Sequence, residues 1–192
     1  MLKKTKKLVF NSKIFRLFII PAILFSTPFF YAPQDIKAGI EFQWNQNSGY
    51  RRLKWIQKQN KKRFRNTIYF FFRPSDRKTD LLKINLAIPK TFKATLKKEK
   101  INFCKVRIGG FENRTKCLEN IPADIEINTD ESSLRSINIY PYSPIPSSKE
   151  SYAVVLKVIN PKKSGLYQFH SYGQPKGKSV SSYLGSWTIV ID

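Results

Sequence analysis

The segment INIYPYSPIPSSKESYAVVLKVINPKKSGLYQFH, residues 137–170, alternates runs of apolar side chains with clusters of proline, serine and glycine. Residues 136–140, 152–159 and 165–170 are rich in the β-branched and aromatic side chains that favour strands. The segments PYSPIPSS and NPKKSG between them are turn signals. Residues 152–159 are apolar on both faces, which predicts a strand at the centre of a sheet.

The same pattern extends on both sides of this segment. Residues 68–72 (IYFFF) are an aromatic run, and residues 81–88 (LLKINLAI) alternate in polarity. The face of 81–88 expected to point into the core consists of Leu82, Ile84, Leu86 and Ile88. Residues 90–100 are charged and predict a loop or one helical turn. More strands are expected at 123–128 and 183–191, and no long helical period follows residue 70. We therefore predict a mainly β fold, an antiparallel β-sandwich of immunoglobulin-like or jelly-roll-like type over residues 66–192.

Cys104 and Cys117 are the two cysteines of the chain and lie on either side of a predicted turn at Gly109–Gly110. If they oppose each other across a hairpin, Val106 faces Thr115. We expect a disulfide, which an oxidising compartment permits and which should stabilise the fold by about 3 kcal/mol. There is no CxxC spacing for redox chemistry. Two cysteines and one histidine also fall short of a usual zinc site, so no metal is expected.

The N-terminal residues 1–38 resemble an export signal. A basic start precedes residues 17–32, which carry no charge and are interrupted by Pro21 and Pro28. This apolar run is shorter than the ~20 residues of a spanning helix, and Ile36-Lys37-Ala38 suits cleavage after Ala38. We predict a signal peptide, with an uncleaved N-terminal anchor as the alternative. Both interpretations place the rest of the chain outside the cytoplasm, in the periplasm or cell envelope.

The chain has 35 lysines and arginines against 13 acidic residues, a formal net charge of +22. Such a surface attracts polyanions without choosing among them. Because export separates the protein from nucleic acid, we expect an anionic envelope component instead: a lipid, a polysaccharide or an acidic protein. The alternative is a structural or assembly protein that has no anionic ligand and whose charge has no function.

The segment YRRLKWIQKQNKKRFRN, residues 50–66, concentrates this charge within an N-terminal strip, residues 39–65. It can form a helix, or a hairpin that turns at KQNKK; its aromatic residues favour the hairpin. Burying so many cations beside so few acids costs too much free energy, so an exposed basic face is expected, with Leu53, Trp55 and Phe64 turned inward. The candidate anion-binding residues are Arg51, Arg52, Lys54, Lys58, Lys61, Lys62, Arg63 and Arg65.

Catalytic signals are weak. A Ser–His–Asp triad would have to use His170, the one histidine, which we expect at a strand surface or capping a loop. Asp124 and Glu126 share a strand face, as exposed strand residues commonly do. No phosphate loop, dinucleotide fingerprint or calcium loop is present. We predict a non-enzymatic protein without a cofactor; an unrecognised hydrolase of envelope polymers is the alternative.

The order of several short motifs resembles an exported cyanobacterial family known only as a domain of unknown function. The resemblance covers about residues 66–191. It includes a strand that ends in IP, a P-x-P step into an apolar strand, an NP turn, a G-x-Y-x-F strand and a Y-L-G segment. The matching residues are Pro89, Pro144, Pro146, Asn160, Pro161, Gly165, Tyr167, Phe169, Tyr183, Leu184 and Gly185. The resemblance implies export to a cyanobacterial envelope and a β-rich domain, and it supplies no catalytic residues.

Overall fold

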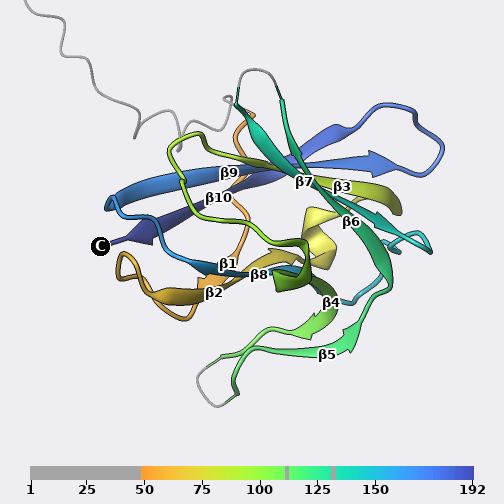
Figure 1. Cartoon of the computed structure of the whole chain (residues 1–192). Coiled ribbons are helices and arrows are strands. Elements are labelled where there is room, and N and C mark those ends of the chain that lie inside the picture. The colour runs from red at the N-terminus through yellow and green to blue at the C-terminus, as the bar shows by residue number, and fades with distance from the viewer. Residues whose placement is uncertain (1–48, 111–112, 131–132) are drawn as a thin grey trace, which may run out of the picture. The chain divides into compact units, whose positions relative to one another are not determined.

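The computed structural model describes residues 49–110, 113–130 and 133–192. In these ranges the chain forms two antiparallel five-stranded sheets, which confirms the predicted β-sandwich (Figure 1). One sheet has the order β1-β2-β8-β4-β5 and the other β10-β9-β3-β7-β6. The strands are β1 (Trp55–Gln57), β2 (Arg65–Phe72), β3 (Leu81–Ile88), β4 (Ile101–Arg107), β5 (Lys116–Asn120), β6 (Ala123–Thr129), β7 (Arg135–Pro141), β8 (Tyr152–Ile159), β9 (Gly165–Pro175) and β10 (Ser182–Ile191). Two 3-10 turns, η2 (Pro74–Asp76) and η3 (Lys98–Lys100), complete the set.

The predicted signal segment, residues 1–38, lies outside the described residues. Among the residues that are described, no helix has the length and apolar character needed to cross a membrane.

Strand β8 lies at the centre of its sheet, as its two apolar faces predict. Its inner face joins a core between the sheets in which aromatic rings dominate. Phe70 lies 4.8 Å from Trp187 and 5.0 Å from Phe169 between ring centroids. All three side chains are fully buried, and burial of a large apolar side chain contributes about 1.5–3 kcal/mol.

The outer face of β8 belongs to a second, smaller apolar cluster. Ala153 and Val155 pack there with Tyr69, Phe71 and Cys104. The tip of the β4–β5 hairpin lies beside Ile56, Lys58 and Tyr69 around a shallow groove, and therefore helps to cover this face.

The Cys104–Cys117 disulfide is present, with Cα atoms 5.7 Å apart, but the predicted hairpin register is wrong. Cys104 lies opposite Asn120, and Cys117 lies opposite Val106. A bulge gives β5 one extra residue, Leu118, which is 54% exposed. The bulge places the cysteines diagonally rather than directly opposite, which remains within the reach of a disulfide.

The predicted inward face of β3 is wrong at one residue, Leu82, because β3 contains a second bulge. Ile84, Leu86 and Ile88 are buried as expected, but Leu82 is 36% exposed and Leu81 is buried in its place. The register shifts between Leu81 and Lys83, so the alternation restarts after the extra residue.

The N-terminal strip connects the two sheets. Arg52 pairs in parallel with Ser186 of β10, whereas Trp55–Gln57 pairs antiparallel with β2, so the hairpin and not the helix is formed. Between these pairings Leu53 enters the core with 1% exposure. We expected the N-terminal strip to end at residue 65 and the sandwich to begin at residue 66. This boundary lies one residue into β2, within a strand that pairs on both sides.

Phe64 does not turn inward as predicted; it is 55% exposed. The backbone carbonyl of Phe64 accepts a hydrogen bond from the backbone N–H of Asn160, where the β2–β8 pairing ends. Beyond this point the two sheets offer no interior in which the ring can be buried.

Candidate anion-binding site

Two turns distant in sequence meet at one end of the sandwich, the β1–β2 turn (residues 58–64) and the β8–β9 turn (residues 160–164). Asn160 joins them: its Nδ2 donates to the carbonyls of Gln59 and Lys61 at 3.2 and 2.9 Å. Its Oδ1 accepts a hydrogen bond from Asn66 Nδ2 at 3.0 Å. Both asparagine side chains are buried, so the first turn is held firmly against the second.

The two joined turns carry a dense group of cations, which we call the basic end. On the first turn and the start of β2 the exposed cations are Lys58, Lys61, Lys62, Arg63 and Arg65; on the second they are Lys162 and Lys163. Lys62 Nζ on the first turn lies 3.5 Å from Ser164 Oγ on the second, so this contact also connects the two turns. Arg63 has a φ of 62°, an unusual value for a residue other than glycine.

The acidic residue Asp192 is hydrogen-bonded to the first of these turns. The side-chain carboxylate of Asp192 accepts a hydrogen bond from Asn60 Nδ2. The backbone oxygen of Asp192 accepts a hydrogen bond from the backbone N–H of Lys62 at 2.8 Å. Within the described ranges, no ion pair involves a cation of the basic end. Their combined field is therefore directed at the solvent.

The loop that follows β3 adds a pocket next to this end of the fold. Phe92 is fully buried and packs edge-on against Tyr167, with ring centroids 5.3 Å apart. The Tyr167 hydroxyl donates to the Lys163 carbonyl at 2.6 Å, which links the loop to the basic end. Arg135 holds the loop in place by donating to the carbonyls of Ala94, at 2.7 Å, and Phe92.

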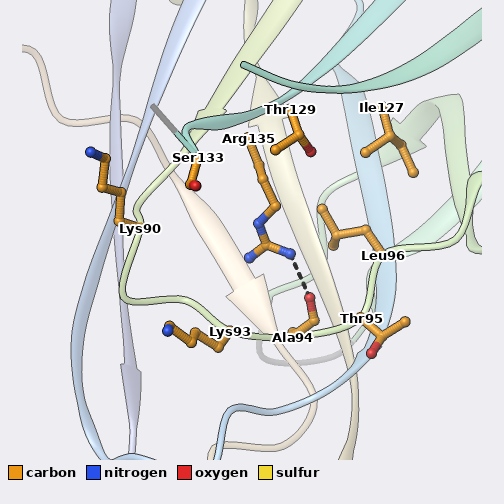
Figure 2. A pocket seen from close by; sticks show the side chains of 9 residues that line it. All are labelled: Lys90, Lys93, Ala94, Thr95, Leu96, Ile127, Thr129, Ser133 and Arg135. Atoms are coloured by element: carbon orange, nitrogen blue, oxygen red, sulfur yellow. Dashed lines mark hydrogen bonds between the residues drawn. The ribbon is translucent and has the colours of Figure 1, made fainter. Parts of the chain in front are cut away.

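Figure 2 shows the Arg135 guanidinium inside this pocket of about 660 Å³. The lining residues are Lys90, Lys93, Ala94, Thr95, Leu96, Ile127, Thr129, Ser133 and Arg135. None of these lining residues is acidic. Burial lowers the pKa of Arg135, yet a guanidinium stays charged at any physiological pH. Cations and hydroxyls in this arrangement can hold the oxygens of a phosphate, sulfate or carboxylate group.

The structure separates the eight predicted anion-binding residues into two groups. Lys58, Lys61, Lys62, Arg63 and Arg65 belong to the basic end. The remaining three, Arg51, Arg52 and Lys54, lie farther along the strip. Arg51 pairs with buried Asp76 at 3.6 Å, Arg52 lies beside β10, and the Lys54 carbonyl accepts from Trp187 Nε1 at 3.0 Å.

The opposite end of the sandwich shows how this protein uses cations structurally. Arg73 donates to Asp76 from Nε at 3.0 Å, and Lys105 pairs with Glu150. Arg77 is 3% exposed and lies 4.8 Å above the Tyr152 ring. These three cations are committed to the fold, whereas the cations of the basic end make no ion pair within the described ranges.

Sequence reasoning missed Lys162, Lys163, Lys90, Lys93 and Arg135. The paired lysines in the turn NPKKSG were a usable signal, because a tight turn exposes both side chains. No sequence signal places Arg135 beside residues 92–94, since that proximity depends on how the strands pair.

The candidate catalytic residues lie in two separate sets of contacts. His170 Nδ1 lies 2.7 Å from Ser186 Oγ, which in turn lies 2.6 Å from the Tyr183 hydroxyl. Burial lowers the pKa of His170, which favours the neutral form of the ring. Asp124 accepts a hydrogen bond from Tyr142. Among the described residues, no three His, Cys, Asp or Glu side chains come together as metal ligands.

A family model described as "Protein of unknown function (DUF2808)" matches residues 44–191. No curated protein matches the chain. Solved structures with a similar fold include BslA, a bacterial hydrophobin, at 10% identity and a TM-score of 0.44, covering 73% of this chain and 91% of that one. The collagen-binding subdomain of the Enterococcus faecalis surface protein ACE is similar at 10% identity and a TM-score of 0.40, covering 73% and 97%. The collagen-binding domain of a Staphylococcus aureus adhesin has 16% identity and a TM-score of 0.35, covering 66% and 87%.

Proposed function

The chain belongs to the DUF2808 family of proteins of unknown function, and we propose that it is an exported, non-enzymatic cell-envelope protein that binds an anionic envelope component through its basic end. The envelope is that of a cyanobacterium, as the resemblance in motif order implies. The component carries phosphate, sulfate or carboxylate groups on a lipid surface, a polysaccharide or an acidic protein.

The observation that carries this proposal is the joining of two cationic turns by one buried asparagine. Like charges repel, so a fold gains nothing by gathering lysines from residues 58–65 and 160–163 at one place. Asn160 nevertheless holds the turns together with three side-chain hydrogen bonds. An anionic ligand spanning both turns would relieve the repulsion and account for the arrangement.

Export is supported by two features of the chain. Residues 1–38 have the charge and length pattern of a signal segment. The Cys104–Cys117 disulfide fits an oxidising compartment.

The test uses two variants of the purified full chain with equal loss of charge. The first, K61Q/K62Q/K162Q/K163Q, removes four cations from the basic end. The matched control, K78Q/K149Q/K176Q/K178Q, removes four exposed lysines from the connections at the opposite end. Binding is measured by sedimentation with vesicles containing anionic lipid, and with a gel of acidic polysaccharide, over a range of salt concentrations.

We expect the native chain and the control to bind at low salt, with affinity falling steeply as salt rises. The basic-end variant should bind at least about tenfold more weakly than the control, a loss of roughly 1.4 kcal/mol. Equal weakening by both variants would show that total charge and not the basic end is responsible. Absence of binding to every anionic probe would favour a structural or assembly role. Shortening of the polysaccharide during incubation would overturn the non-enzymatic assignment.

A further inference from the structure

The outward face of the β10-β9-β3-β7-β6 sheet differs chemically from the rest of the molecule. The sheet register assigns to it one set of alternating side chains from each strand. We call this surface the tyrosine–amide face; its members are Tyr183, Ser186, Thr188, Gln168, His170, Tyr172, Gln174, Lys83, Asn85, Ala87, Ser136, Asn138, Tyr140, Asp124, Glu126 and Asn128, with the exposed Leu166 and Val190 at one end. Amides, hydroxyls and phenol rings predominate on it.

Charge is nearly balanced on this face of a chain whose formal net charge is +22. Its one lysine, Lys83, is placed with the ammonium 4.8 Å from the centre of the Tyr140 ring. Asp124 and Glu126 lie on its β6 margin, and Arg52 lies at its β10 margin. Lysine is the usual residue on solvated faces of this protein, so its scarcity here suits a partner without charge.

The rings of the tyrosine–amide face are held in position. A bulge at Leu184 places both Tyr183 and Ser186 on this side of the sheet. Ser186 is fully buried, and its hydroxyl lies 2.6 Å from the Tyr183 hydroxyl and so fixes that ring. The Tyr172 and Tyr183 ring centroids lie 5.8 Å apart, and Tyr183 remains 37% exposed. A fixed ring loses little conformational freedom on binding, which makes it a favourable contact surface.

The amides are fixed in the same way across the centre of the sheet. Asn85 Nδ2 donates to Asn138 Oδ1 at 2.7 Å, and these residues lie in one row between Tyr172 and Glu126. Asn138 is buried, so the half-buried Asn85 is the amide of this pair that a partner can reach. The neighbouring row runs from Ser186 through His170, Ala87 and Ser136 to Asn128.

From this combination we propose that the tyrosine–amide face binds an uncharged, extended polysaccharide. The C–H faces of sugar rings stack on fixed phenol rings, and sugar hydroxyls both donate to and accept from amides and hydroxyls. A row of side chains that extends across the strands fits an extended, β-linked chain better than a helical glucan. This site is separate from the basic end, so the protein can connect a neutral polymer to an anionic one.

The test measures adsorption of the full chain to swollen cellulose, with insoluble starch as the helical comparison. Experiments are run at about 1 M NaCl, where the Debye length is about 3 Å and binding by the basic end is suppressed. We expect adsorption to cellulose that persists in high salt and exceeds adsorption to starch. The variant Y172A/Y183A should bind cellulose with an affinity at least about tenfold lower than that of the native chain. F64A, which removes an exposed ring at the basic end, should bind as the native chain does.

A second variant covers the case in which Y172A/Y183A fails to fold. Q168A/N128A removes two polar groups from the same face at little cost to stability, and it should weaken adsorption about threefold or more. The proposal is overturned if the native chain does not adsorb to cellulose at high salt, or if both face variants adsorb as well as F64A. Salt-sensitive self-association through the face, seen by light scattering without adsorption, would identify the partner as a second copy of the chain and would also overturn it.

Discussion

Asn66 on β2 donates a hydrogen bond to Asn160 across a 3.0 Å contact that is closed to solvent. The same Asn160 side chain also donates to the carbonyls of Gln59 and Lys61. One amide therefore connects the interior of the sandwich to the cationic turn at its surface. The position of the basic end depends on this connection as well as on the pairing of β2 with β8.

Replacing Asn160 by alanine should lower the free energy of unfolding by about 3 kcal/mol. Three hydrogen bonds are lost, each worth roughly 1 kcal/mol, and the buried Asn66 amide is left without its acceptor. Chemical denaturation of N160A measures the effect, with N128A, an exposed asparagine on β6, as the control. A loss of less than about 1 kcal/mol would mean that water replaces the missing side chain.

Reduction of the Cys104–Cys117 disulfide should lower the free energy of unfolding by about 3 kcal/mol, because the bond closes a short loop and restricts the unfolded chain. Denaturation with and without a reductant tests this. The variant C104A/C117A should lose more than reduction alone, because Cys104 is fully buried in the outer apolar cluster and alanine leaves a cavity. Equal stability of the oxidised and reduced forms would contradict the prediction.

Gly185→Ala should destabilise the protein much more than Gly165→Ala. Both glycines have nearly the same φ, 147° and 146°, a conformation that strains any other residue. A Cβ at Gly185 would lie 2.7 Å from the Arg51 carbonyl oxygen and from Leu53 Cγ, whereas a Cβ at Gly165 meets nothing within 4 Å. The difference between the two should reach about 2 kcal/mol, the cost of overpacking. Similar losses would show that residues 51–53 move aside easily.

Stability should decrease as the pH falls from about 7.5 to 5.5, and His170 should be responsible. Burial holds its pKa below the ordinary value near 6.5, so the unfolded chain binds the proton more tightly. The stabilisation is therefore complete above about pH 6.5 and is lost as the pH falls through the lower pKa of the folded state. Thermal unfolding over this range measures the slope. H170Q, which removes the one histidine of the chain, should show a much flatter profile.

The predictable part of the fold is the part decided by local pattern. Strand β8 was recognisable at the centre of a sheet because both of its faces are apolar, and its observed limits, Tyr152–Ile159, match the prediction. The disulfide was predictable because a turn signal lies between the two cysteines. The exposure of Lys61 and Lys62 was also predictable, because charged side chains in a turn remain in water.

The candidate site was predictable only where its residues are neighbours in sequence. Lys58–Arg65 was recognised as a cationic segment, but its companion Lys162–Lys163 and the pocket around Arg135 were not. The strip was expected to present one basic face, whereas Arg51 turns to Asp76 at the other end of the fold. Tyr172 and Asn138 gave no functional signal, because each belongs to an ordinary alternating strand until the sheet places them in one row.

Local sequence is enough to predict where strands form, which turns separate them and which side chains alternate between water and core, because these depend on neighbouring residues. The register of the β4–β5 hairpin, the exposure of Phe64 and the meeting of the two cationic turns depend instead on how distant strands pack together. A bulge of one residue reverses every later side chain on a strand, and its energy depends on packing against distant strands. Pairings between distant segments are likewise selected by the whole core, through contacts such as Asn66 with Asn160, which no local pattern contains.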